Sequence, residues 1–174
     1  LPIQNLLEKN EEYLLVIQLE SGDRMICYYT RIIESQNSYV SECIDFVKQF
    51  NDTTFDSEKA SSLSTYMEKT TGDNTTLQYV TLNNSLNQVS WAEFHGTRLT
   101  TPVPSVKEIT PTYNVIVLDY VVTRVGQNGQ SEYYNVEEYY RVRYTNTRMY
   151  LLNFERTMEE IFRGENDSIS GNSI

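Results

Sequence analysis

Basic residues are scarce in this chain, and their scarcity argues against two classes of function. Its 174 residues include 14 Lys and Arg against 24 Asp and Glu, so the formal net charge at pH 7 is −10. A protein that binds nucleic acid through its phosphates needs a basic surface, and docking on anionic lipid needs a cluster of Lys and Arg. We therefore expect neither a nucleic-acid partner nor electrostatic attachment to a membrane.

Histidine and cysteine are also rare, which argues against a structural metal site. The only histidine is His95, and Cys27 and Cys43 stand apart with no CxxC spacing, so the four ligands of a zinc site are not supplied. If residues 24–50 formed one straight helix, the two sulfur atoms would lie about 24 Å apart, beyond the reach of a disulfide. We expect two small buried hydrophobic cysteines and no metal.

The familiar catalytic motifs are missing as well. The sequence contains no GxGxxG, GxxxxGK[ST], HExxH or GxSxG motif. A nucleophile–histidine–acid triad would have to use His95, but a histidine beside aromatic residues at a strand edge is more often structural. The acidic pairs Glu137–Glu138 and Glu159–Glu160 lack the spacing of a calcium loop. We therefore predict a chain with no enzymatic activity and no cofactor.

Long apolar runs are absent, and glycine and proline are few. No stretch approaches the roughly 18 apolar residues that span a membrane. With 7 Gly, 4 Pro and 39% hydrophobic residues, the composition is that of an ordinary packed core. At about 100–200 residues per domain, the length predicts one domain with a short appendage. Because the chain begins with Leu1 rather than Met, we expect that an upstream segment has been removed, by processing or by the choice of the expressed segment.

The helical patterns lie in the first half of the chain. Residues 24–50 carry an apolar stripe at helical spacing, which the polar stretch 34–38 divides into two helices. The stripe consists of Met25, Tyr29, Ile32, Val40, Cys43, Val47 and Phe50. A second helix is predicted over residues 58–69, with Ala60, Leu63 and Met67 on its buried side. Residues 13–19 form an apolar run whose periodicity fits either a strand or a helix.

From residue 76 onward the apolar residues alternate with a period of two, which predicts strands. The predicted strands span residues 77–82, 93–101, 113–125, 132–144 and 148–154. Asn128 and Gly129 join the two long strands and are typical of a two-residue type I′ turn. Three prolines within residues 102–111 predict a loop, because proline does not fit a central strand. Residues 155–162 are expected to form a short helix or an extension.

The turn determines which side chains of the two long strands share a face. With Asn128 and Gly129 as the turn, cross-strand partners have residue numbers that add up to 257, and the apolar face they form is predicted to be buried. The pairs on this face are Tyr113–Tyr144, Val115–Val142, Val117–Tyr140, Asp119–Glu138, Val121–Val136 and Thr123–Tyr134.

One pair on this face is not apolar. Asp119 opposite Glu138 would place two carboxylates among valines and tyrosines, where they repel each other and lose solvation. One interpretation is a binding pocket formed by Asp119, Glu138, Tyr140, Val117 and Val121, with a proton shared by the two acids. The other is a β-bulge that shifts the register and turns one carboxylate to solvent, or a face that is open to water.

Helices followed by antiparallel strands predict an α+β fold, with N-terminal helices packed on a strongly curved antiparallel sheet. We predict that residues 1–38 are a helical lead-in or an extra strand. Residues 39–163 are predicted to form the α+β domain. Residues 164–174, which are rich in Ser, Asn and Gly, are predicted to be a disordered tail.

The order of these elements resembles the cone of the nuclear transport factor 2-like superfamily. Residues 40–50 correspond to its long helix and residues 58–69 to its short helix. Residues 113–127 and 130–144 correspond to its long central strands, and residues 148–154 to its last strand. The resemblance covers residues 39 to about 156 and implies a cone-shaped α+β domain.

The superfamily implies two readings of function. One branch holds non-enzymatic extracytoplasmic domains of bacterial envelope machines, including assembly factors of type IV secretion and of Gram-positive conjugation. It implies an interaction or scaffold domain that self-associates or binds other subunits, with a removed N-terminal anchor as its only membrane contact. The other branch holds ketosteroid isomerase-like binders and enzymes of isomerase or dehydratase type. It implies a small-molecule pocket at Asp119, Glu138 and Tyr140.

Overall fold

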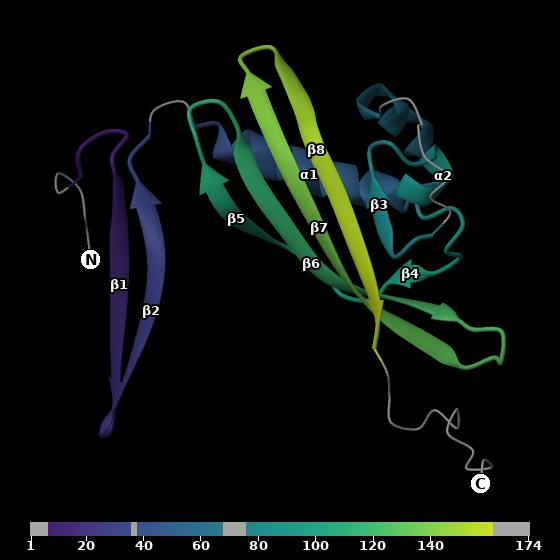
Figure 1. Ribbon diagram of the computed structural model, residues 1–174, viewed down its shortest axis with the longest axis horizontal. Coiled ribbons are helices and arrows are strands. Elements are labelled where there is room, and N and C mark those ends of the chain that lie inside the picture. Colours follow the sequence, from purple (N-terminus) through teal and green to yellow (C-terminus); the bar gives the residue numbers. More distant parts are fainter. Residues whose placement is uncertain (1–6, 36–37, 68–75, 162–174) are drawn as a thin grey trace, which may run out of the picture. The chain divides into compact units, whose positions relative to one another are not determined.

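The structure is a computed structural model that describes residues 7–35, 38–67 and 76–161. The chain divides into two compact units, Leu1–Ser38 and Tyr39–Ile174, which we call unit 1 and unit 2. Their elements are labelled in Figure 1. The predicted disordered tail, residues 164–174, lies outside the described residues. Among the described residues, no helix is long and apolar enough to cross a membrane.

Unit 1 is a β-hairpin. Its strands β1 (Glu12–Ser21) and β2 (Arg24–Ile33) pair antiparallel along their whole length. The turn between them is formed by Gly22 and Asp23, and Gly22 has a φ of +60°, which glycine adopts without steric cost. The apolar run at residues 13–19, which periodicity alone does not assign, is therefore a strand.

The helix predicted from residue 24 is wrong over its first ten residues, which form β2. This segment is apolar at most positions, so a helical stripe can be drawn through it even though its backbone is extended. Ile26, Tyr28 and Ile32 favour the strand, because branched and aromatic side chains pack well on a pleated surface. The helix begins only at Val40.

Unit 2 combines helices with an antiparallel sheet. Its helical elements are α1 (Val40–Thr54), the 3₁₀ helix η1 (Ala60–Tyr66) and α2 (Leu86–Val89). Its strands are β3 (Tyr79–Thr81), β4 (Thr97–Arg98), β5 (Val103–Ile109), β6 (Asn114–Val125), β7 (Ser131–Thr145) and β8 (Arg148–Glu160). The described strands follow the order β3-β8-β7-β6-β4, with β5 also paired to β6, and all pairs are antiparallel. The predicted α+β class with an antiparallel sheet is confirmed.

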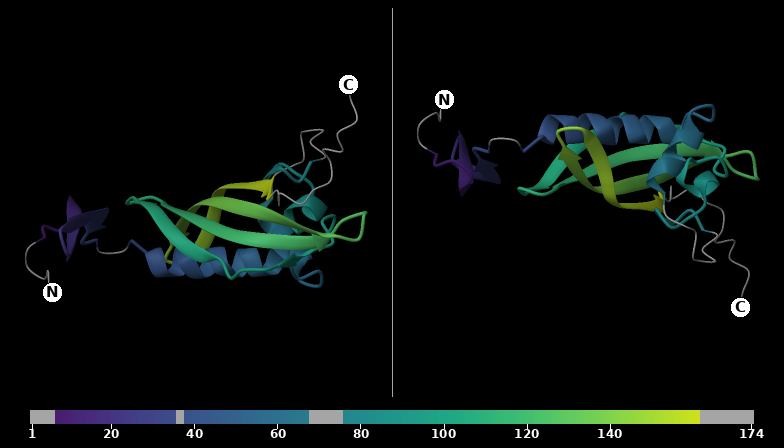
Figure 2. Two further views of the ribbon diagram at one scale, coloured as in Figure 1. Left: turned by 90° about the horizontal axis from the view of Figure 1, so that it is seen from below. Right: turned by 90° about the horizontal axis from the view of Figure 1, so that it is seen from above.

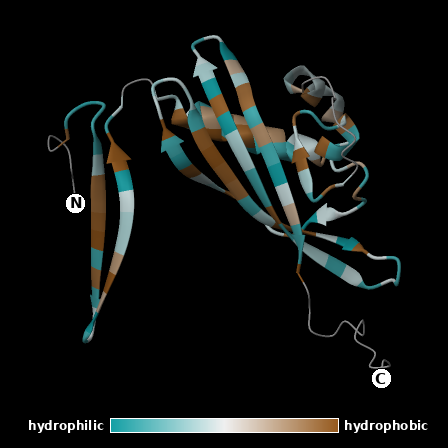
Figure 3. Ribbon diagram, viewed as in Figure 1, coloured by the Kyte–Doolittle hydropathy of each residue, from teal (hydrophilic) through white to brown (hydrophobic). Residues whose placement is uncertain are grey.

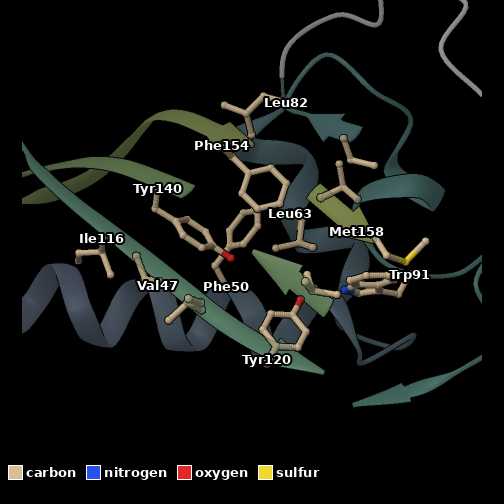
Figure 4. Packing of buried hydrophobic residues seen from close by; sticks show 14 of the residues in the cluster. Val47, Phe50, Leu63, Leu82, Trp91, Ile116, Tyr120, Tyr140, Phe154 and Met158 are labelled. Carbon is tan, nitrogen blue, oxygen red and sulfur yellow. The ribbon is translucent and has the colours of Figure 1, made fainter. Parts of the chain in front are cut away.

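Helix α1 runs along one face of this sheet, as both views of Figure 2 show. We call the face that α1 covers the inner face and the opposite one the outer face. The buried residues of α1 are Cys43, Val47, Phe50, Asn51 and Thr54, which recur at the three- and four-residue spacing of one helix face. The ring of Phe50 lies 5.7 Å from that of Tyr140 and 5.3 Å from that of Phe154 (Figure 4). Through this aromatic cluster, α1 packs against the centre of the sheet.

The predicted proline loop is a strand in the structure. Residues 103–109 form β5, in which Pro104 lies opposite Leu118 of β6. Within the described residues β5 pairs only with β6, so it is an edge strand. An edge strand tolerates proline because one side of its backbone makes no ladder hydrogen bonds. Similarly, residues 155–160 are not helical but extend β8.

The turn between β6 and β7 differs from the predicted one by a single residue. The amide of Gly126 donates to the carbonyl of Gln130 at 2.8 Å, and the amide of Gly129 donates to the carbonyl of Gly126 at 3.0 Å. Gly129 has a φ of +77°. This is a three-residue loop that ends in a left-handed glycine, not the two-residue turn that the Asn-Gly pair predicts. Cross-strand partners therefore add up to 256, as for Val125 and Ser131.

Candidate functional site

The one-residue change in the turn separates the two predicted carboxylates. Asp119 lies opposite Glu137, and Glu138 lies opposite Leu118. Because side chains alternate between the two faces of a sheet, Asp119 and Glu138 are on opposite sides. Asp119 is exposed, whereas Glu138 is fully buried. The predicted Asp119–Glu138 pair is therefore wrong.

The other predicted pocket residues are divided in the same way. Glu138 and Tyr140 point to the inner face, where α1 packs. Val117 and Val121 share the outer face with Asp119, because their residue numbers have the same parity on β6. The prediction was right about which residues of β7 face the core and wrong about β6. The predicted pocket is thus not assembled, and each part has its own surroundings.

Glu138 is the centre of a buried polar cluster on the inner face. Its Oε2 accepts hydrogen bonds from Asn51 Nδ2 at 2.8 Å and from the hydroxyl of Tyr140 at 2.6 Å. Its Oε1 accepts a hydrogen bond from the hydroxyl of Tyr120 at 2.8 Å. The donors come from α1, β6 and β7, so this carboxylate connects the helix to the middle of the sheet.

Arg156 of β8 supplies the positive charge of this cluster. It lies opposite Glu138 in the sheet, is fully buried, and places its Nη1 3.8 Å from Glu138 Oε1. The same nitrogen donates to the carbonyl of Val89 at 3.0 Å, and Nη2 donates to the carbonyl of Gln88. The guanidinium carbon lies 3.6 Å from the ring centroid of Trp91, which is close enough for a cation–π contact. Arg156 therefore joins the sheet to the end of α2.

The protonation of the cluster follows from its burial. Burial, and secondly the negative charge of Glu138, raise the pKa of both Tyr120 and Tyr140 well above the usual value. Burial lowers the pKa of Arg156. The two phenols are therefore held as neutral donors to the carboxylate at neutral pH. Since Glu138 has no exposed surface, a substrate could reach it only by displacing core side chains.

Sequence reasoning missed Asn51, Tyr120 and Arg156. Asn51 belongs to the buried stripe of α1, one turn after Val47, and a polar residue at such a position signals a buried hydrogen bond. Arg156 alternates with the buried Phe154 and Met158, which places it on the inner face once β8 is known to extend that far. That these residues contact Glu138 depends on the packing of elements that are distant in the sequence, and no local sequence pattern reports such packing.

The outer face has a different acidic feature. Asp119 and Glu137 lie directly opposite each other, with Glu159 of β8 nearby, and these residues line an open hollow of about 570 Å³. Thr100, Val121, Asn135 and Thr157 also line it. Like charges directly opposite on neighbouring strands destabilise a sheet, so this end of the outer face favours the approach of positive charge.

The two cysteines form no disulfide within the described residues, and each lies in a different unit. Cys43 is fully buried, accepts a hydrogen bond from Asn114 Nδ2 at 3.3 Å, and has a pKa that burial raises. Cys27 is only half-buried, so the prediction of two buried cysteines is confirmed for Cys43 alone. His95 is exposed. Among the described residues, no group of three His, Cys, Asp or Glu side chains is arranged to hold a metal ion.

The fold and the cluster together define a class of protein: an α+β domain with an open antiparallel sheet and a polar network enclosed in its core. Comparisons of the chain with known protein families, with characterised proteins and with solved structures found no match. The function therefore has to be argued from the chain's own surfaces.

Proposed function

We propose that this chain is a non-enzymatic interaction or scaffold domain of an extracytoplasmic bacterial assembly, such as a conjugation or secretion channel. In this proposal unit 2 is a nuclear transport factor 2-like cone, whose surfaces bind other copies or other subunits. The order of α1, η1 and the long β6–β7 hairpin supports the resemblance. The location outside the cytoplasm rests on the resemblance alone.

The observation that carries the proposal is the surface of unit 1. Ile17, Leu19, Ile26 and Tyr28, which share one face of the hairpin, are 44–55% exposed although the strands are fully paired with each other. Figure 3 shows a hydrophobic stretch in the middle of β1, with hydrophilic positions toward the turn. An isolated two-stranded hairpin is only marginally stable in water, and exposed apolar surface of this kind marks an interaction site. Unit 1 thus supports a role in binding another protein.

The interior of unit 2 supports the same proposal. In a cone-type binder or enzyme, acidic and tyrosine side chains would face an accessible cavity. Here Glu138, Tyr120 and Tyr140 are buried and bonded to one another. The alternative of a small-molecule site between Asp119 and Glu138 has lost its basis, because the two residues lie on opposite faces.

Native mass spectrometry of the chain purified from its producing cells tests the proposal. We expect the spectrum to show the chain in complex with further copies of itself or with envelope subunits, and without a bound small molecule. Replacing Ile17 and Ile26, which share one face of unit 1, by threonine should dissociate these species while preserving strand propensity. The matched control replaces Gln18 and Glu20 on the other face by threonine. A monomer that carries a defined adduct of cofactor size would overturn the proposal.

A further inference from the structure

We propose that the outer face of unit 2 is a self-complementary surface on which a second copy of this chain packs with its strands reversed. The inference rests on the proposed role as an assembly domain and names the partner and the surface. It is drawn from the distribution of charge along β6, β7 and β8, which is positive at one end of the outer face and negative at the other.

The positive end consists of arginines supported by tyrosine rings. The guanidinium of Arg141 lies 5.1 Å from the ring centroid of Tyr113, and those of Arg143 and Arg148 lie 4.9 and 5.0 Å from the ring centroid of Tyr150. All three arginines are exposed. Two acidic side chains are hydrogen-bonded near this end: Glu108 accepts a hydrogen bond from the Tyr113 hydroxyl at 3.2 Å, and Glu155 accepts one from Asn153, which lies opposite Arg141, at 2.8 Å. Within the described part of the chain, none of the three arginines forms an ion pair.

The negative end lies on β6, β7 and β8, whereas the arginines of the positive end come from β7 and β8. Asp119, Glu137 and Glu159 line the open hollow described above, and within the described residues none of them is paired with a cation. Arginine side chains are long and flat enough to enter such a hollow, and their guanidinium groups bind carboxylates in a fixed fork geometry. The acidic hollow at one end is therefore complementary in charge to the arginines at the other.

The spacing of the two ends is compatible with a two-fold axis. On β7 the outer-face residues run Asn135, Glu137, Tyr139, Arg141 and Arg143. The two-fold axis lies between the two sheets at the level of Tyr139, parallel to the sheets and perpendicular to the strands. It brings Glu137 of one copy opposite Arg141 of the other, and Asn135 opposite Arg143. The four residues from Glu137 to Arg141 span about 13 Å. Such a contact is isologous, so every pairing occurs twice and the assembly closes as a dimer.

The centre and the size of the face suit such a contact. Tyr139 at the centre is partly exposed and lies opposite the buried Val117 of β6, so Tyr139 itself provides an aromatic middle between the two charged ends. Strands β5 to β8, at about 4.8 Å apart and about 3.3 Å per residue, give a mean plane of roughly 600 Å². Their side chains enlarge this area toward the roughly 800 Å² that each partner buries in a standard interface.

A second copy fits this surface better than an unrelated acidic or basic partner. A partner with a single sign of charge would be attracted to one end of the face and repelled by the other. The chain's net charge of −10 opposes unspecific association between copies. Only a partner with the same two-ended pattern in reverse order satisfies both ends, and this chain has that pattern when it is turned around.

Charge reversal tests the inference in the full chain. Sedimentation equilibrium should show a dimer of the wild type, and Glu137→Arg or Arg141→Glu alone should weaken it by roughly tenfold or more, since each change occurs at two contacts. An equimolar mixture of the two single variants should dimerise again, because every facing pair is then of opposite sign. The control is Asp45→Arg on the exposed face of α1, which should change nothing.

The outcomes separate this inference from the proposed function. If the assembly is insensitive to both reversals but lost in the Ile17 and Ile26 variant, the interaction role stands and the outer face is not its surface. A wild type that stays monomeric, or a mixture that does not recover, also overturns the inference. If a small-molecule adduct is present in place of a partner, the proposed function itself fails.

Discussion

The residue that governs the interior of unit 2 is Glu138. Its carboxylate accepts three hydrogen bonds in the core and faces the buried guanidinium of Arg156. Removing water from both charges is costly, so such a pair adds little net stability compared with apolar residues. The pair nevertheless connects α1 to the middle of the sheet, because Asn51 of α1 donates a hydrogen bond to the same carboxylate.

Replacing Glu138 with glutamine should destabilise the protein by about 3 kcal/mol, because the buried charge of Arg156 then lacks its counter-charge. Urea unfolding of the full chain measures the change. The matched control is Glu93→Gln, at an exposed position, which should alter the free energy of unfolding by less than about 0.5 kcal/mol. Equal effects of the two substitutions would show that the cluster does not depend on the charge of Glu138.

Among the elements, the β6–β7 loop has the largest influence on the faces of the sheet. Its three residues end in Gly129 with a φ of +77°. A residue with a Cβ atom is strained in this conformation. Gly129→Ala should therefore cost about 1 kcal/mol, and Gly129→Asn should cost less, because asparagine tolerates the left-handed region.

Thermal and urea unfolding would measure both Gly129 variants, with Gln127→Ala in the same loop as the control. Gln127 is exposed, so its replacement should be neutral. If Gly129→Ala were as stable as the control, the loop would not require a left-handed residue. The three-residue loop described here would then be incorrect.

The same loop shows how far the sequence alone leads. The alternation in residues 132–144 was sufficient to predict that Tyr134, Val136, Glu138 and Tyr140 face the core. Their partners on β6 were not predictable, because an Asn-Gly pair fits a two-residue turn or a three-residue loop, and one residue exchanges the two faces. The β2 segment was predicted as a helix for a related reason. Where most positions are apolar, the period carries little information.

Arg156 and Asn51 mark a second limit of the sequence. Each is a polar residue at a buried position, and the local pattern shows at most that it requires a partner. Which partner it finds depends on the packing of α1 on β7 and of β8 beside β7. The candidate site was therefore predictable in its central residue, Glu138, and not in the groups that surround it.

At the scale of the whole molecule, buried tyrosine hydroxyls make the free energy of unfolding depend on pH in the alkaline range. Tyr120 and Tyr140 have pKa values raised well above the usual value, and burial raises the pKa of Tyr134 to about 12. The folded state therefore holds these protons more tightly than the unfolded state. The stability that they contribute is fully present below about pH 10, the pKa of an unfolded tyrosine, and is lost as the pH rises through the folded values.

Urea unfolding at a series of pH values should accordingly show the free energy of unfolding falling above about pH 10, by up to about 1.4 kcal/mol per pH unit for each buried phenol. Tyr140→Phe should reduce this slope by the contribution of about one proton. Tyrosinate absorbance in the folded and unfolded states would measure the same difference in bound protons independently. A free energy of unfolding that does not change across this range would contradict the enclosed cluster.

The contact between Arg156 and Trp91 has an optical consequence. Trp91 is the only tryptophan of the chain, and its indole lies directly under a buried cation and beside the ring of Phe55 at 5.4 Å. Its fluorescence therefore arises from one known environment, at the junction of β8 with the end of α2. Emission from this single fluorophore follows the separation of that junction in real time, without any label being introduced.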